Sequence, residues 1–259
     1  MRLPIYQIDA FTDRIFGGNP AAVVPLESWL PDATMQAIAA ENNLAETAFF
    51  VRDGARYDLR WFTPTVEVDL CGHATLAAGY LILTRLSPGA DRVDFMTRSG
   101  KLSVTRVGEH FALDFPSRPP EPVASGKAVA EALGAAPVEL LAARDYLAVF
   151  EHEDQVRALR PDMEKVAALD RFAVIATAPG TSCDFVSRFF APAQGVPEDP
   201  VTGSAHCTLI PYWAKRLGRS KLHARQVSAR VGELFCEDLG PRVSIGGRAA
   251  LYLEGVIHV

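Results

Sequence analysis

The sequence has few cysteines, and their spacing matches no standard disulfide or zinc arrangement. The four are Cys71, Cys183, Cys207 and Cys236, and no two of them form a C-x-x-C pair. In a chain of 259 residues they are interpreted as reduced, mostly buried thiols, because disulfide frameworks belong mainly to small secreted proteins. His73 and His206 lie near two of these thiols, but their spacing fits no structural zinc site, so we expect no metal.

The chain also lacks a long apolar run and a basic segment. Its longest apolar run, near Ala74 to Leu83, is about half as long as a bilayer-spanning helix. Asp9 and Asp13 interrupt the beginning of the chain, which therefore does not resemble a signal peptide. The 26 Lys and Arg against 31 Asp and Glu give a formal charge of -5, whereas phosphate binding needs a basic face. We expect a soluble cytoplasmic protein without a membrane or nucleic-acid partner.

Three common catalytic and cofactor motifs are missing. There is no dinucleotide-binding G-x-G-x-x-G, no phosphate-binding P-loop and no G-x-S-x-G turn of a serine hydrolase. The sequence therefore offers no motif for a bound nucleotide.

One motif occurs twice. Arg60-Trp61-Phe62-Thr63-Pro64 is followed by Gly72-His73-Ala74, and Arg188-Phe189-Phe190-Ala191-Pro192 is followed by Gly203-Ser204-Ala205. Both copies read Arg, aromatic, Phe, any residue, Pro, a loop and then Gly-x-Ala, and they lie about half the chain length apart. This spacing predicts a duplication of one structural unit and not a solenoid, which needs more copies.

Each Gly-x-Ala is predicted to begin a buried helix. The segment from His73 to about Leu83 is apolar on nearly every side, and the segment from Ser204 to about Leu217 is similar over its first three turns. A helix that is apolar all round must be buried. Pro211 inside the second helix is expected to kink it or weaken one turn.

The remaining chain is rich in predicted strands, which favours an α+β fold. The expected architecture has two pseudo-symmetric halves, residues 1–116 and 117–259, each with a mixed sheet rolled around its central helix. The Pro-rich segment 115–122 is the expected linker between them. Surface helices are expected to begin near Pro31 and at Ser125. A cleft between duplicated halves is a common ligand site.

The two helix starts suggest an anion-binding site. Free backbone N–H groups and a partial positive charge occur at a helix N-terminus, and glycine lets a carboxylate or phosphate approach closely. If the halves face each other, Gly72 and Gly203 would serve one ligand. The alternative is that these glycines only permit tight packing of helix against strand.

Several other polar residues are candidates on sequence alone. Glu46 directly precedes an apolar strand, where burial would raise its pKa toward a range useful for proton transfer, although a solvent-exposed strand end is equally compatible. Asp199 precedes a proline and is either a turn residue or a carboxylate of the site. The segment Gly17-Gly18-Asn19-Pro20 is interpreted as a turn that could line the cleft.

A set of segments, in this order, resembles the PhzF-like family of phenazine biosynthesis, which shares the diaminopimelate epimerase fold. The segments are Asp9–Thr12, Gly17–Val23, Asn43–Phe49, Arg60–Pro64, Cys71–Thr75 and Glu198–Ala205. Together they span most of the chain and are highly specific, whereas each alone is weak.

The resemblance implies a cofactor-free isomerase, commonly a homodimer, that moves a proton within a small carboxylate-bearing substrate. In the phenazine enzyme of the family that substrate is a dihydro-hydroxyanthranilate. The glutamate that moves the proton matches Glu46, and the supporting polar residues match His73, Asp199 and Ser204. The substrate carboxylate would bind near Gly72-His73 and Gly203-Ser204, with Asn19 and Cys71 also in the site. A helix-capping role is the alternative for His73.

The resemblance leaves the reaction type open. The related epimerases use two cysteines as opposed acid and base, and here Cys71 matches the first while the repeat places Thr202 at the second. One alternative is therefore an amino-acid racemase or epimerase that uses Cys71 with another base. Another is a non-catalytic protein that binds a small carboxylate. Neither the substrate nor the pathway follows from the sequence.

Overall fold

The computed structural model describes residues 1–259 and divides them into two compact units. The first consists of Met1–Asp114 with Gly246–Val259, and the second of Phe115–Ile245. The division after Asp114 lies near the predicted boundary, but assigning all of 117–259 to the second half is wrong for the last residues. Strand β17 (Ala249–His258) pairs antiparallel with β1 (Arg2–Ala10) over the full length of β1, so the C-terminal strand belongs to the first unit.

The sheet of the first unit runs in the order β17-β1-β2-β3-β4-β6-β7-β8. β2 and β3 are parallel, as are β4 and β6, and the other neighbours are antiparallel. The remaining strands are β2 (Asn19–Leu26), β3 (Glu46–Asp53), β4 (Arg56–Phe62), β5 (Glu67–Val68), β6 (Arg92–Thr97), β7 (Gly100–Val107) and β8 (His110–Pro116).

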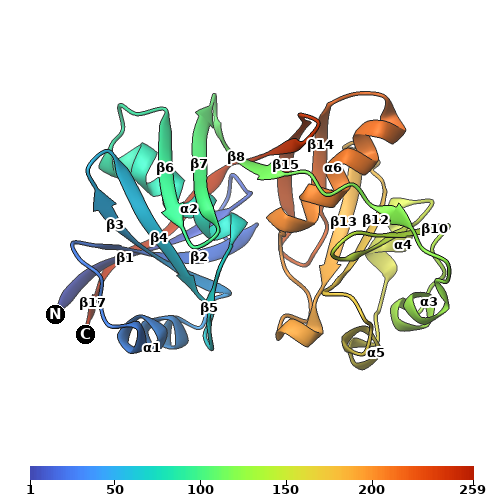
Figure 1. The fold of residues 1–259 in the computed structure, drawn as a ribbon, viewed down its shortest axis with the longest axis horizontal. Helices are drawn as coiled ribbons and strands as arrows, with labels where there is room; N and C mark the ends of the chain where they lie inside the picture. Colours follow the sequence, from blue (N-terminus) through green and yellow to red (C-terminus); the bar gives the residue numbers. More distant parts are fainter. The chain divides into compact units, whose positions relative to one another are not determined.

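Helix α2 (Gly72–Leu81) lies inside this sheet (Figure 1). It contacts β1, β2, β3, β7 and β17, and a single π-helical turn, η1 (Ile82–Leu86), continues it. Its residues are buried on every side except at Gly72 and Tyr80, as predicted for a helix that is apolar all round. Helix α1 (Asp32–Asn42) covers the outside of the sheet with Met35, Ile38 and Ala39 buried, which confirms the helix expected near Pro31.

The second unit contains strands β9 to β16 and the central helix α6 (Gly203–Leu217). Pro211 lies within α6 and does not interrupt it. The strands are β9 (Glu121–Pro122), β10 (Glu139–Ala142), β11 (Tyr146–Val149), β12 (Val174–Pro179), β13 (Phe185–Phe190), β14 (Lys221–Gln226), β15 (Gly232–Asp238) and β16 (Arg242–Gly247). The short helices are α3 (Lys127–Leu133), α4 (Glu153–Ala158), α5 (Met163–Ala167) and the 3₁₀ turn η2 (Pro192–Gln194).

The pairing pattern of the strands confirms the duplication. In the first unit, β1 to β4 and then β6 and β7 pair in the sequence antiparallel, parallel, antiparallel, parallel, antiparallel. Strands β10 to β15 of the second unit pair in that same sequence. In both units the central helix follows the fourth of these strands, so β4-loop-α2 and β13-loop-α6 are equivalent.

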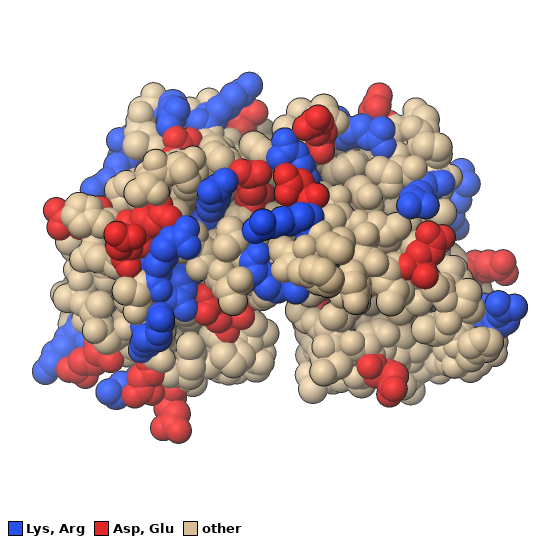
Figure 2. Space-filling model, turned by 180° about the vertical axis from the view of Figure 1, so that it is seen from behind, with Lys and Arg blue, Asp and Glu red and all other residues tan.

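The surface and the helices bear on the expected partners. On the face drawn in Figure 2, acidic and basic side chains are interspersed and form no broad area of one sign. None of the helices combines the length and the apolar character that a membrane crossing would need.

Candidate active site

The first unit brings five of the predicted site residues together at the start of α2. Glu46 is the first residue of β3 and lies opposite Ala21 of β2, whose first residue is Asn19. Cys71 is the N-cap residue of α2, and Gly72 and His73 begin its first turn. Two adjacent parallel strands and one helix N-terminus thus converge on one point. The interpretation of residues 17–20 as a turn was wrong for Asn19, which is a fully buried strand residue.

His73 lies at the centre of this group. Its Nε2 is 3.1 Å from Oε2 of Glu46, and its Nδ1 is 3.2 Å from Nδ2 of Asn19 and 3.6 Å from Sγ of Cys71. With Asn19 donating, the neutral ring accepts at Nδ1 and carries its proton on Nε2, which faces the Glu46 carboxylate. Rotation of the Asn19 amide presents its oxygen to a protonated ring, so Asn19 is compatible with both protonation states. The ring of His73 therefore contacts three other side chains of the site, in addition to forming part of the first helical turn.

The pKa of Glu46 shifts opposite to the sequence expectation. Burial alone would raise it, but the charge and the hydrogen bond of His73 outweigh burial and lower it. Burial likewise opposes a proton on His73, but its pKa is raised well above 6.5, by Cys71 where that thiol is ionised and by the carboxylate of Glu46 at neutral pH. Near neutral pH these two directions favour an ionised, partly buried Glu46 beside a protonated, buried His73. The sequence expectation rested on the apolar strand alone. It did not include His73, which folding brings next to Glu46 and whose charge lowers the pKa of the carboxyl.

Cys71 is a neutral thiol in this arrangement. Its side chain is buried, and burial together with the negative charge of Glu46 raises its pKa to about 11. A thiol in this state is a poor base near neutral pH, because only the thiolate accepts a proton.

Glu46, Cys71 and His73 also carry groups that can bind a metal ion. One ligand atom each from Glu46, Cys71 and His73 lie within 4.8 Å of one another. The contacts do not favour a shared ion, since Nε2 of the ring faces the carboxylate while Nδ1 faces the thiol. The carboxylate and the ring lie 3.1 Å apart and are placed as an ion pair, and the expected absence of a metal stays a prediction.

In the second unit, Gly203 and Ser204 begin α6 as predicted. The guanidinium of Arg144 donates from Nη2 to Oγ of Ser204 at 3.2 Å and forms a two-bond pair with the buried carboxylate of Asp145. Arg144 was not a sequence candidate, because an Arg-Asp pair ahead of a strand is a common surface feature.

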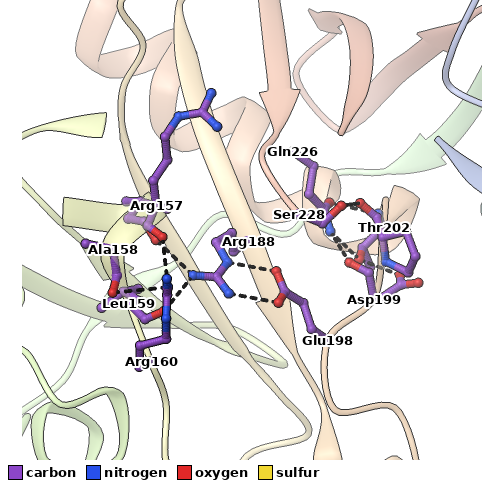
Figure 3. A network of polar contacts seen from close by, with 12 residues as sticks. Arg157, Ala158, Leu159, Arg160, Arg188, Glu198, Asp199, Thr202, Gln226 and Ser228 are labelled. Atoms are coloured by element: carbon purple, nitrogen blue, oxygen red, sulfur yellow. Dashed lines mark hydrogen bonds and ion pairs between the residues drawn. The ribbon is translucent and has the colours of Figure 1, made fainter. Parts of the chain in front are cut away.

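Asp199 lies in the loop before α6, where its carboxylate accepts a hydrogen bond from the hydroxyl of Thr202. Gln226 accepts from the Thr202 backbone N–H at 2.8 Å and donates to the Asp199 carbonyl at 2.7 Å (Figure 3). Sequence reasoning missed Gln226, although a signal exists. Leu222, Ala224 and Gln226 alternate on one buried strand face, and an amide there needs polar partners.

Comparing the two units shows that the acid–base groups belong to the first one. Aligning Gly72 with Gly203 matches Cys71 to Thr202 and His73 to Ser204. Thr47 pairs with Phe62 and Val174 with Phe190, which matches Glu46 to Ala173. The glutamate, histidine and cysteine of one copy thus correspond to alanine, serine and threonine in the other.

Known proteins are similar to this chain over nearly its whole length. The family model "PhzC-PhzF: Phenazine biosynthesis-like protein" matches residues 8–255. An uncharacterised isomerase of Pseudomonas aeruginosa is 52% identical over 259 residues, covering 100% of both chains. The human phenazine biosynthesis-like domain-containing protein is 38% identical and covers 99% of both chains.

Solved structures with a similar fold point to the same family. A PhzF-family protein of Enterococcus faecalis superposes with a TM-score of 0.98 at 48% identity, with 100% of both chains covered. A hydroxyproline epimerase of Agrobacterium vitis, at 11% identity, has a TM-score of 0.59 over 99% of this chain and 92% of its own, and shares the fold alone. The α+β, epimerase-like fold expected from the sequence is confirmed, and the chain is a member of the PhzC-PhzF phenazine biosynthesis-like family and an isomerase.

Proposed function

We propose that this isomerase moves a proton between two carbon atoms of a small carboxylate-bearing substrate without a cofactor, with Glu46 as general acid and base. The observation that carries the proposal is the contact between Glu46 Oε2 and His73 Nε2 at 3.1 Å in a buried setting. It supplies a carboxylate that is ionised at neutral pH and can therefore accept a proton.

The proton balance needs no further reactant. The Glu46 carboxylate removes a proton from one carbon, and the electron pair left behind is delocalised over the substrate. The same carboxyl group returns the proton to a second carbon, which regenerates the carboxylate. The His73 imidazolium stabilises the charged form of Glu46 before and after each cycle. Burial of the His73 ring keeps the two groups aligned, while the 18% exposure of the Glu46 side chain lets its proton exchange with solvent.

The polar groups of the second unit suit substrate recognition better than proton removal from carbon. Ser204 and Thr202 carry hydroxyls, and Arg144 carries a fixed positive charge beside the first turn of α6. A guanidinium and helix N–H groups both favour a carboxylate. We propose Gly203 and Ser204 of the second unit as carboxylate-binding groups on this basis, and Gly72 of the first unit by the same argument for its own helix start. Asp199, an anionic acceptor, suits an amine or hydroxyl of the substrate. A homodimeric, cytoplasmic protein remains the expectation that the sequence resemblance gave.

The experiment is solvent-deuterium incorporation, followed by NMR, into a dihydro-hydroxyanthranilate and a panel of 2-amino and 2-hydroxy acids. Glu46→Gln keeps the shape of the side chain and removes its basicity. We expect its rate of incorporation to fall by about 10³-fold or more, while the substrate that the wild type turns over still binds. Full exchange activity in Glu46→Gln would remove Glu46 from the role.

One observation favours a second candidate, an epimerase that uses Cys71. The Cys71 sulfur lies 3.6 Å from Nδ1 of His73, a ring that can take up the thiol proton when it is in its neutral form. Its high pKa and the threonine at the equivalent position argue against a two-thiol mechanism. Cys71→Ser separates the two candidates, because it abolishes a thiol reaction and largely spares a glutamate reaction. A non-catalytic carrier is disfavoured, since close relatives are isomerases.

A further inference from the structure

The loops that lead into the two central helices are held by the same ion pair in both units. We call residues 67–71 and 198–202 the lead-in loops. Arg60 of β4 forms a two-bond fork with Glu67, with N–O distances of 2.7 and 2.7 Å. Arg188 of β13 forms the matching fork with Glu198 at 2.7 and 2.8 Å (Figure 3). Each glutamate is the first residue of its lead-in loop.

A second tie is also duplicated. The hydroxyl of Ser99 donates to the carbonyl of Asp69 at 2.8 Å, and that of Ser228 donates to the carbonyl of Pro200 at 2.8 Å. Asp69 and Pro200 stand at the same position in the two lead-in loops. Each loop is therefore fixed at two points. An arginine of the preceding strand holds its first carboxylate, and a serine that follows β6 or β14 holds one of its carbonyls.

Each arginine also anchors its loop to a second element. Arg60 contacts Asp32, the first residue of α1, at 2.9 Å. Arg188 donates to the carbonyls of Val156 and Leu159, at the end of α4, at 3.1 and 3.0 Å. Both arginines have side chains less than one-fifth exposed, so solvent competes little for these forks.

The Arg–Glu fork and the serine hydrogen bond occur in both units, although the residues at the two helix starts differ. Cys71 and His73 in one unit correspond to Thr202 and Ser204 in the other, yet the fork and the serine tie occur in both. Neither N-cap residue, Cys71 or Thr202, makes a side-chain cap. The first turn of each central helix is thus located by its lead-in loop, since apolar packing of the helix body is not directional.

We propose that the Arg–Glu forks and serine ties form a duplicated clamp that sets the position of both helix starts. In the first unit this makes Glu67 and Ser99 positioning residues for Cys71 and His73, and through them for the His73–Glu46 contact. Their importance for catalysis rests on the proposed function of Glu46.

The test is an NMR pH titration of the His73 ring in the full chain, assigned by the signal that is lost in His73→Asn. Ser99→Ala removes the serine tie. Glu67→Gln removes the charge of the fork with Arg60, and with it the ion pair that Glu67 makes with Arg98 at 2.8 Å. Ser103→Ala is the matched control, because its hydroxyl donates to Asp94 at 2.7 Å and makes no contact with the lead-in loop. We expect the pKa of His73 to fall by about one unit in both tie variants and to stay unchanged in the control.

The second readout is the kcat for deuterium exchange, expected to fall about tenfold in the tie variants with a smaller change in KM and an unchanged melting temperature in Ser99→Ala. A wild-type His73 titration in both tie variants would overturn the clamp. That titration needs no substrate, so it judges the clamp even if Glu46→Gln retains activity and the proposed function fails.

Discussion

His73 has two ring nitrogens, and folding supplies a different partner for each. Nε2 faces the carboxylate of Glu46, and Nδ1 faces Asn19 and Cys71. Because the ring is buried, the loss of either charge in the Glu46–His73 pair leaves the other without compensation, which is costly in a low-dielectric site. The pair therefore titrates as a unit, and its pH dependence reports on both residues.

The pH dependence of activity has a predicted sign on each side. The lowered pKa of Glu46 keeps its carboxylate ionised above pH 4.5, and the raised pKa of His73 keeps its proton below pH 6.5 and well beyond. We expect kcat/KM to decrease on the acid side only below pH 4.5. On the alkaline side it should decrease as the pH rises through the raised pKa of His73.

The contribution of the Glu46–His73 pair to the free energy of unfolding depends on pH through the same two pKa values. The part from Glu46 is present above pH 4.5 and is lost as the pH falls through its lowered pKa. The part from His73 is present below pH 6.5 and is lost as the pH rises through its raised pKa. His73→Gln should move the acid limb of kcat/KM upward, since burial of Glu46 then acts without a compensating charge. An acid limb that stays in place would contradict the pairing.

At the scale of elements, α2 approaches β7 closely at Gly79. A Cβ built on Gly79 would lie 2.6 Å from a methyl group of Val104, so this position has no space for a side chain. We expect Gly79→Ala to destabilise the chain by about 1–3 kcal/mol, measured by urea unfolding. The gain in helix propensity is smaller than this cost.

The matched control is Gly89→Ala, because nothing lies within 4 Å of a Cβ at that position. Adding Val104→Ala to Gly79→Ala should recover part of the lost stability. Equal unfolding free energies for Gly79→Ala and Gly89→Ala would show that the close packing is not present in solution.

β2 is a strand that its local sequence does not indicate. Pro20 and Pro25 make a poor strand signal, since proline cannot donate to a ladder. In the structure Pro20 precedes the residues of β2 that pair with β3, and Pro25 lies beyond those that pair with β1. Each proline thus sits where only one neighbouring strand is paired. Such tolerance depends on register, which the local sequence does not contain.

At the scale of the molecule, the C-terminal strand completes the unit that the N-terminal strand begins. β17 runs beside β1 from the Arg2–His258 pair to the Ala10–Ala249 pair. Removal of residues 249–259 would leave β1 with an open edge and expose apolar side chains of the first unit. We expect the truncated chain to melt at least about 10 °C lower, or to be recovered only as aggregate.

Deletion of Val259 alone serves as the control, because this residue lies outside β17. Calorimetry of the two chains checks the prediction. A truncated protein with the melting temperature of the full chain would mean that β17 contributes little to the first unit.

The sequence by itself determined the duplication, the two glycine-started buried helices, the family and the identity of the candidate residues. These follow from local patterns, since a helix apolar on all sides and a repeated motif are readable without coordinates. Tertiary structure alone decided that residues 246–259 belong to the first unit and that the pKa of Glu46 is lowered. Strand partners and pKa values depend on which distant groups come into contact, and His73 reaches Glu46 only once β3 and α2 have packed together.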